Sequence, residues 1–203
     1  IGDTAGSQNW PDGSRYWQDE STGPIQNWAD FEAYPWPKVE ELNHLALEYV
    51  SSVLPEGMKL AAFMFGGVFE MSSWMMGLQP FSYALFDQPD LVEAICNRVG
   101  ELATATAAQA AAIDNVEMVY FSDDLGYYSS TLISPAALRK YVFPHYKKVS
   151  QAVRGAGKLL VYHSCGNMYN VMDEIIDEIG IDAKHSFEDK ILPVEEAYKR
   201  WGD

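Results

Sequence analysis

The sequence predicts an α/β protein and, within that class, part of a (β/α)8 barrel, the TIM-barrel architecture. Four short apolar runs alternate with helical stretches, as parallel strands joined by helical crossovers do. Polar residues able to do chemistry follow these runs directly, where barrel enzymes place their active sites. No GxGxxG or Walker motif marks a doubly wound nucleotide-binding sheet. Because a full barrel takes about 250 residues, we expect four to five βα units of a longer chain.

The first 37 residues are predicted to form an irregular segment ahead of the barrel, which then occupies residues 38–203. Gly, Pro, Asn, Asp and aromatic residues are frequent there, and apolar residues recur with neither the strand nor the helix period. The aromatic residues between Trp10 and Trp36 are interpreted as packing this segment onto the end of the barrel. The functional alternative is that they form the mouth of a pocket.

The first regular elements should be a helix and a buried strand. Apolar residues at helical spacing predict a helix over Lys38–Val53 that Pro55 ends. The apolar run 60–65 then predicts a strand buried on both faces, closed by Gly66-Gly67. A second helical region is expected to follow this turn.

The middle of the chain should hold the longest helix, over about Pro89–Ile113, because proline suits its first turn and apolar residues recur with the helix period. The run 116–121 predicts the second strand. Ser134-Pro135 has the cap-and-proline pattern that opens a further helix, and Pro144 is expected to kink that helix.

Two more strand and helix pairs complete the prediction. The run 158–162 predicts the third strand and leads into His163-Ser164-Cys165-Gly166-Asn167. A helix around 171–179, a strand over 181–187 and a last helix around 194–201 should follow.

Composition narrows the classes of partner and compartment. The chain has 29 acidic and 14 basic residues, a net charge of −15, which would repel nucleic acid and anionic lipid. The longest apolar runs are too short to span a bilayer, and no signal peptide opens the sequence. Cys96 and Cys165 lie in different settings and are read as reduced thiols. We therefore expect a cytoplasmic protein with a small-molecule substrate and no nucleic-acid or membrane partner.

His163 and Cys165 form the sharpest pair of candidate functional residues. Positions i and i+2 of a strand point to the same face, here toward the barrel mouth. Imidazole and thiolate are both good zinc ligands. An HxC pattern alone leaves two coordination positions to fill, so a core histidine beside a buried cysteine is an equally good interpretation.

Carboxylates and a second histidine are the other candidates at strand ends. Of Asp123 and Asp124, one should face the barrel axis as a base or ligand and the other should cap a turn. Glu70 is expected to cap the next helix; alternatively it reaches the pocket. His185 could share the mouth with His163.

Four segments carry a resemblance to a known family. The stretches 162–187 (YHSCGNMYNVMDEIIDEIGIDAKHSF), 121–149, 65–81 and 197–203 are similar to the uroporphyrinogen decarboxylase superfamily, and more closely to its methyltransferase-like branch. The resemblance covers the chain from about Lys38 onward and implies a single (β/α)8 barrel.

The superfamily contains two chemistries, and this sequence departs from the first. Its decarboxylases hold the carboxylates of a tetrapyrrole with an N-terminal arginine-rich motif and use a tyrosine in the GG…G segment. Here the N-terminal part has only Arg15, Trp74 stands at the tyrosine position, and Asp123 matches a serine of the decarboxylases. Uroporphyrinogen decarboxylation is therefore disfavoured and kept as an alternative.

The second chemistry is that of corrinoid-dependent methyltransferases, which bind zinc through an HxC and a more distant cysteine. His163 and Cys165 match the HxC, and no cysteine follows Cys165, so the third ligand should come from outside this chain or the site is degenerate. In such enzymes zinc lowers the pKa of an acceptor thiol, and the thiolate attacks a methyl group on cobalt.

The resulting hypothesis is a methyltransferase that moves a methyl group between a corrinoid (cobalamin) protein and a small thiol or similar acceptor. His163 and Cys165 are the expected metal ligands. The residues assigned to catalysis are Asp123, Asp124 and His185, and those assigned to cofactor binding are Gly66, Gly67 and Glu70. The non-enzyme alternative is a corrinoid- or tetrapyrrole-binding barrel without catalysis.

Overall fold

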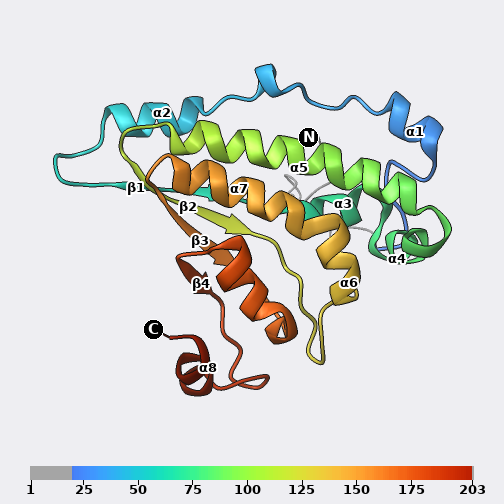
Figure 1. Cartoon of the computed structure of the whole chain (residues 1–203). Coiled ribbons are helices and arrows are strands. Elements are labelled where there is room, and N and C mark those ends of the chain that lie inside the picture. The colour runs from blue at the N-terminus through green and yellow to red at the C-terminus, as the bar shows by residue number, and fades with distance from the viewer. Residues whose placement is uncertain (1–19, 203) are drawn as a thin grey trace, which may run out of the picture.

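The computed structural model describes residues 20–202 of the chain, whose centre is a four-stranded parallel sheet (Figure 1). The strands are β1 (Leu60–Met64), β2 (Val116–Ser122), β3 (Leu159–His163) and β4 (Ala183–His185). They pair in chain order, β1-β2-β3-β4, and every pair is parallel. The predicted βα alternation and the predicted order of the strands are both confirmed.

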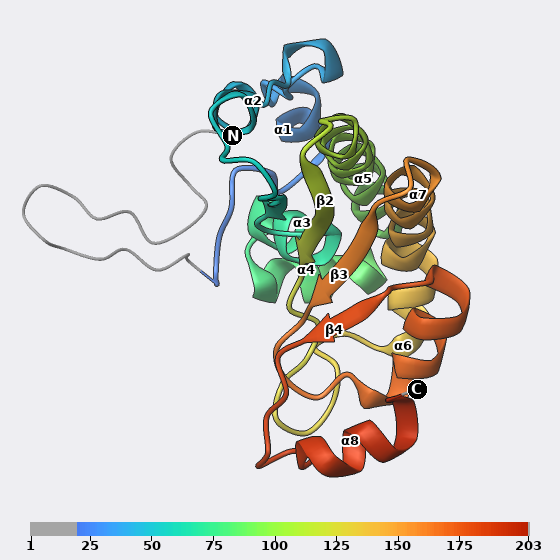
Figure 2. The same cartoon turned by 90° about the vertical axis from the view of Figure 1, so that its left-hand side faces the viewer.

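Helices α5 (Pro89–Ala111) and α7 (Phe143–Gly155) lie side by side on one face of the sheet (Figures 1 and 2). Proline in the first turn and apolar residues at helical spacing account for α5, as predicted. Strand side chains that point toward these helices are buried: Val119, Phe121, Leu160 and Tyr162. This interface is the core of the described structure.

The opposite face of the sheet is uncovered in the described part of the chain. Along β1, buried Ala62 and Met64 alternate with exposed residues, and Phe63 is 61% exposed. Phe65, directly after the strand, is 62% exposed. The prediction that this strand is buried on both faces is therefore wrong for these residues, because helices pack on one face alone.

Two helices, α3 (Val68–Met76) and α4 (Leu78–Asp87), form the predicted second helical region after β1. A serine and a proline open the helix after β2 as predicted: the Oγ of Ser134 accepts a hydrogen bond from the backbone N–H of Ala137 in α6 (Pro135–Ala137). The segment then continues through the π-helical turn η2 (Leu138–Val142) into α7. Proline at the start of α7 lacks the N–H that a regular helix needs, which fits the irregular turn before it.

The predicted helix over 38–53 is interrupted. A 3-10 turn η1 (Val39–Glu41) and helix α2 (Leu45–Ser52) replace it, and Leu42 between them is extended. The side chain of Asn43 accepts a hydrogen bond from the backbone N–H of Leu45, a local bond that competes with helix formation.

The predicted irregular segment also needs correction, since residues 28–33 form helix α1 (Trp28–Ala33). The side chain of Asn27 caps it by accepting from the N–H of Asp30. Tyr34 and Trp36 pack against the core and also line a cavity of about 720 Å³ between this segment, α5 and β1. The packing interpretation therefore holds for Tyr34 and Trp36, and a role as the mouth of a functional pocket remains a prediction. Trp10 and the other residues up to position 19 lie outside the described part.

The C-terminal elements are shorter or less regular than predicted. The strand expected over 181–187 is limited to β4, and the helix expected over 171–179 contains a 3-10 turn η3 (Tyr169–Val171) and a π-helical stretch η4 (Glu174–Ile179). Helix α8 (Val194–Trp201) matches its prediction. Among the described helices, none is long and apolar enough to cross a bilayer.

Candidate metal centre

The carboxyl ends of β2 and β3 bring two polar segments together. Ser122 and His163 are partners in the ladder, and the N–H of Asp123 donates to the carbonyl oxygen of His163 at 3.0 Å. Beyond the strands, the N–H of Gly126 donates to the carbonyl oxygen of Cys165 at 3.2 Å. Asp124 and Cys165 therefore leave the sheet side by side.

The backbones of Gly126 and Gly166 touch where these two loops run together. A Cβ on Gly126 would lie 2.4 Å from the carbonyl carbon of Gly166, and one on Gly166 would lie 2.3 Å from that of Gly126. Gly166 also has a φ of 74°, which side chains disfavour. Glycine at both positions permits the close approach that aligns the loops.

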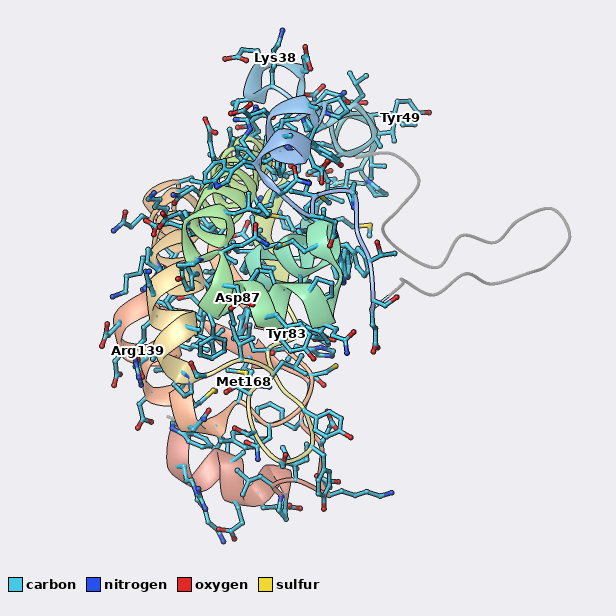
Figure 3. The ribbon with its side chains drawn as sticks, turned by 90° about the vertical axis from the view of Figure 1, so that its right-hand side faces the viewer. Lys38, Tyr49, Tyr83, Asp87, Arg139 and Met168 are labelled. Carbon is cyan, nitrogen blue, oxygen red and sulfur yellow. The ribbon has the colours of Figure 1, made fainter. Side chains whose placement is uncertain are left out.

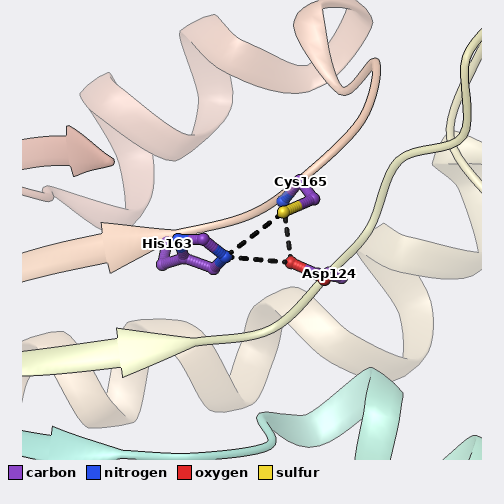
Figure 4. Close-up of side chains that lie close together, drawn as sticks. All are labelled: Asp124, His163 and Cys165. Atoms are coloured by element: carbon purple, nitrogen blue, oxygen red, sulfur yellow. Dashed lines mark hydrogen bonds and ion pairs between the residues drawn. The ribbon is translucent and has the colours of Figure 1, made fainter. Parts of the chain in front are cut away.

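Three side chains converge at this point (Figure 4): Asp124, His163 and Cys165. The Nε2 of His163 lies 3.4 Å from Asp124 Oδ1 and 3.4 Å from Cys165 Sγ. The backbone N–H of Cys165 donates to the same Asp124 oxygen at 2.7 Å. All three potential ligand atoms lie within 4.8 Å of one another. The expectation that the carboxylate, histidine and cysteine meet at the strand ends agrees with this geometry.

The donor set fits a zinc ion. Zinc takes nitrogen at about 2.0 to 2.1 Å, oxygen at about 2.0 to 2.2 Å and thiolate sulfur at about 2.3 Å in a tetrahedron, so two of its ligand atoms lie about 3.3 to 3.6 Å apart. The two separations measured from His163 Nε2 lie in this range. A set of three protein ligands leaves the fourth position open, as in catalytic zinc sites.

Asp124 changes the predicted ligand set. The family resemblance implies a third ligand from outside this chain, or a degenerate site. The structure places a third donor within the chain, on the loop after β2. Of the two adjacent aspartates, Asp124 is the one that faces His163 and Cys165.

Burial sets the protonation of the two predicted ligands. It lowers the pKa of His163, the carboxylate of Asp124 opposes this shift, and the imidazole is kept neutral, the form that binds metal. Burial also raises the pKa of the Cys165 thiol, against a hydrogen bond from the Oγ of Ser186 at 3.6 Å. A bound cation would favour the thiolate.

Asp123 has a structural role as a helix cap, and its assignment to catalysis remains a prediction. Its fully buried carboxylate accepts from the N–H groups of Phe69 and Glu70 at 2.7 and 2.8 Å and from the hydroxyl of Tyr146 at 2.6 Å. Burial raises the pKa of Asp123 to about 6, against these three hydrogen bonds. The residue caps the N-terminus of α3 and points away from the metal donors.

The Gly66-Gly67 turn serves the same cap. Gly66 has a φ of 73°, and a Cβ on Gly67 would lie 2.3 Å from the Cβ of Asp123. Both glycines are therefore required by the path of the chain. Their assignment to cofactor binding remains a prediction.

Glu70 lies in the first turn of α3 and does not cap it, contrary to the favoured expectation, because Asp123 supplies the cap. Its buried Oε2 has no hydrogen-bond partner in the described structure. Burial, and then the charges of Asp123 and Asp124, raise the pKa of Glu70 to about 8. The functional alternative, that this carboxyl reaches the site, remains a prediction.

His185 lies on the far side of His163 from the metal donors. The two Nδ1 atoms are 2.6 Å apart, and the hydroxyl of Tyr120 contacts both. Tyr120 is not among the residues expected at the site from the sequence. The available signal was strand alternation, since Tyr120 stands two residues before Ser122 and so shares the face of His163.

Parallel βα units with polar residues at the strand ends define this chain as part of a (β/α)8-barrel protein. Residues 20–202 match the family profile described as "Uroporphyrinogen decarboxylase (URO-D)". The chain therefore belongs to the uroporphyrinogen decarboxylase family.

A solved structure agrees with this fold. A methyltransferase from Methanosarcina mazei superimposes with a TM-score of 0.63 at 18% sequence identity, over 76% of this chain. The chain spans 43% of the length of that neighbour, as expected for a partial barrel. A search of curated proteins gives no match.

Proposed function

We propose that the protein is a zinc-dependent methyltransferase that moves a methyl group between a corrinoid and a small thiol or similar acceptor. The observation that carries the proposal is the convergence of Asp124, His163 and Cys165 on one point at the strand ends. The resemblance of the HxC segment to corrinoid-dependent methyltransferases supports the choice of reaction, and the methyltransferase from Methanosarcina mazei has the same fold.

In this proposal the three side chains hold the ion. When bound, zinc would supply a Lewis acid that lowers the pKa of an acceptor thiol, and the corrinoid would supply the methyl group. Neutral His163 offers Nε2, and Asp124 offers the oxygen that also fixes the backbone of Cys165. Glu70, with its pKa raised to about 8, holds a proton beside the carboxylates at neutral pH.

The face of the sheet that carries no helix in residues 20–202 is the face that lines the interior of a (β/α)8 barrel, and aromatic rings lie on it next to these residues. Phe63 and Tyr120 have ring centroids 5.2 Å apart, and Phe63 and Phe65 have centroids 6.4 Å apart. The reduced state of Cys96 and Cys165 supports a cytoplasmic location.

Arginine placement favours this reaction over decarboxylation of a tetrapyrrole. Recognition of several carboxylates calls for guanidinium groups at the site. The arginines in residues 20–202 make other contacts: Arg98 with Glu101, Arg139 with Glu174, Arg154 with Asp182 and Arg200 with the ring of Trp201.

Metal content is the test. Elemental analysis should find one zinc per molecule in the wild-type protein and strong loss in Cys165→Ser and Asp124→Asn, together with loss of thiol methylation from a methylated corrinoid. Cys96→Ser, which changes the buried cysteine of α5, is the matched control and should keep its zinc. A zinc-free wild type whose activity survives Cys165→Ser would refute the proposal and favour a binding barrel.

A further inference from the structure

The side of His163 that faces away from Asp124 and Cys165 is occupied by a small polar cluster. Tyr120 Oη lies 3.1 Å from His163 Nδ1, and His185 Nδ1 lies 2.6 Å from the same atom. Tyr120 Oη and His185 Nδ1 also contact each other. Each of the three groups is therefore within hydrogen-bond distance of the other two.

Strand pairing fixes this cluster. His163 and His185 are direct partners in the β3-β4 ladder, with ring centroids 4.9 Å apart. Tyr120 lies on β2, and its ring is 6.0 Å from that of His163 and 5.4 Å from that of His185. The three side chains come from three neighbouring strands of the sheet and not from loops.

The proton arrangement follows from the role of His163. A neutral imidazole has one nitrogen with a proton and one with a lone pair. If Nε2 gives its lone pair to a metal, the proton must lie on Nδ1. Nδ1–H can then donate only to groups with a lone pair, which are His185 Nδ1 and Tyr120 Oη. Nδ1 of His185 has one lone pair, which the Tyr120 hydroxyl proton takes, so His163 Nδ1–H donates to Tyr120 Oη.

We propose that Tyr120 and His185 are positioning residues that hold His163 in the Nδ1–H tautomer with Nε2 directed at Asp124 and Cys165. This inference rests on the proposed function. Groups that accept from the second nitrogen of a ligating histidine fix its ring and its tautomer and commonly change metal affinity about 10- to 100-fold. His185, assigned to catalysis from sequence, acts through His163 in this scheme.

Zinc affinity measured by competition with a chromophoric chelator tests the inference without reference to activity. We expect Tyr120→Phe, which removes the acceptor of His163 Nδ1–H, to weaken zinc binding about 10- to 100-fold, and His185→Phe, which removes the acceptor of the Tyr120 hydroxyl, about 10-fold. His185→Asn, which keeps an acceptor oxygen near Nδ1, should recover part of the loss. Tyr83→Phe, at an exposed tyrosine of α4 (Figure 3), and His44→Asn are the matched controls and should bind zinc as the wild type does.

A second readout separates orientation from general damage to the fold. With Co²⁺ in place of zinc, the thiolate charge-transfer band reports the bond to Cys165, and the ligand-field bands report the geometry. The variants should keep the thiolate band at saturating Co²⁺ and show altered ligand-field bands, and their unfolding transitions with chelator present should match the wild type.

The outcomes distinguish this inference from the proposed function. Wild-type protein that binds neither zinc nor Co²⁺ would refute the metal site itself. Wild-type protein that binds zinc, with Tyr120→Phe, His185→Phe and their double variant all of equal affinity, would leave the metal site intact and overturn the positioning role.

Discussion

Phenylalanine and tyrosine side chains lie on both faces of the sheet but differ in burial and in their contacts. On the face toward α5 and α7, Phe121 and Tyr162 are almost fully buried, and the hydroxyl of Tyr162 donates to a backbone carbonyl. On the other face Phe63 is exposed, and Tyr120 contacts histidines near the metal donors. The covered face therefore supplies stability, and the other face carries the residues next to the candidate metal centre.

The largest loss of stability should come from removing a large side chain from the covered face. Phe121→Ala is expected to lower the free energy of unfolding by about 3 to 5 kcal/mol, because it leaves a cavity in a close-packed core. Phe63→Ala, the matched change on the uncovered face, should cost no more than about 0.5 kcal/mol. Urea unfolding measures both, and equal losses would show that the two faces do not differ in burial.

Breaking the Asp123 cap should cost slightly less. Asp123→Ala leaves two helix N–H groups and the hydroxyl of Tyr146 without their acceptor in a buried setting, an expected loss of about 3 kcal/mol. Asp123→Asn keeps one acceptor oxygen and should lose less. Urea unfolding checks this, and a loss below about 1 kcal/mol for Asp123→Ala would contradict a capping role.

Acid should weaken the covered side through His145, a buried residue of α7 packed against Gly100. Burial, and then the charge of Lys148, lower the pKa of His145 to about 4. In the unfolded chain the pKa of His145 is about 6.5. Below that pH the imidazole binds a proton in the unfolded chain but not in the folded protein, so the free energy of unfolding falls as the pH drops from 6.5 to 4. The contribution of His145 to this loss of unfolding free energy is at most about 3 kcal/mol.

The His145→Gln variant isolates this contribution from those of other groups. The difference in unfolding free energy between wild type and variant should change across pH 6.5 to 4 and stay constant from pH 7 to 8. A difference that does not vary with pH would show that His145 is protonated freely in the folded protein.

The smallest effect on stability should come from the metal donors. Cys165→Ser replaces a sulfur atom by a smaller oxygen atom in a partly exposed loop. With chelator present, it should change the free energy of unfolding by no more than about 0.5 kcal/mol. With zinc present, the wild type should unfold at higher urea than the variant, since a ligand that binds the folded state stabilises it. Unfolding in zinc and in chelator makes the comparison, and equal midpoints in zinc would contradict it.

The sequence predicted the parallel strands and their order well, because each strand is a short apolar run flanked by helices with clear periodicity. It did not predict which face of β1 is covered, since a run such as LAAFM is apolar at every position. Burial depends on what packs against each face, and local sequence does not contain that information. The interruption at Asn43 was likewise hidden within an apolar pattern of helical period.

The candidate site was predicted in part. Alternation along β3 placed His163 and Cys165 on one face, and that is where they lie. It required Asp123 and Asp124 to point in different ways but could not say which faced the site, since this depends on where β2 ends and how it is registered with β3. Tyr120 was missed because a single tyrosine in a strand is ordinary core composition until the neighbouring strands are placed beside it.

The contact between Gly126 and Gly166 has a consequence for how this protein could diverge. Barrel enzymes usually acquire new substrates by changing the loops after their strands. Here the backbones of the loops after β2 and β3 touch at Gly126 and Gly166, where neither backbone has room for a side chain. A side chain at Gly126 or Gly166 should therefore push the two loops apart and disturb the Asp124, His163 and Cys165 cluster, so divergence that keeps this cluster should keep both glycines.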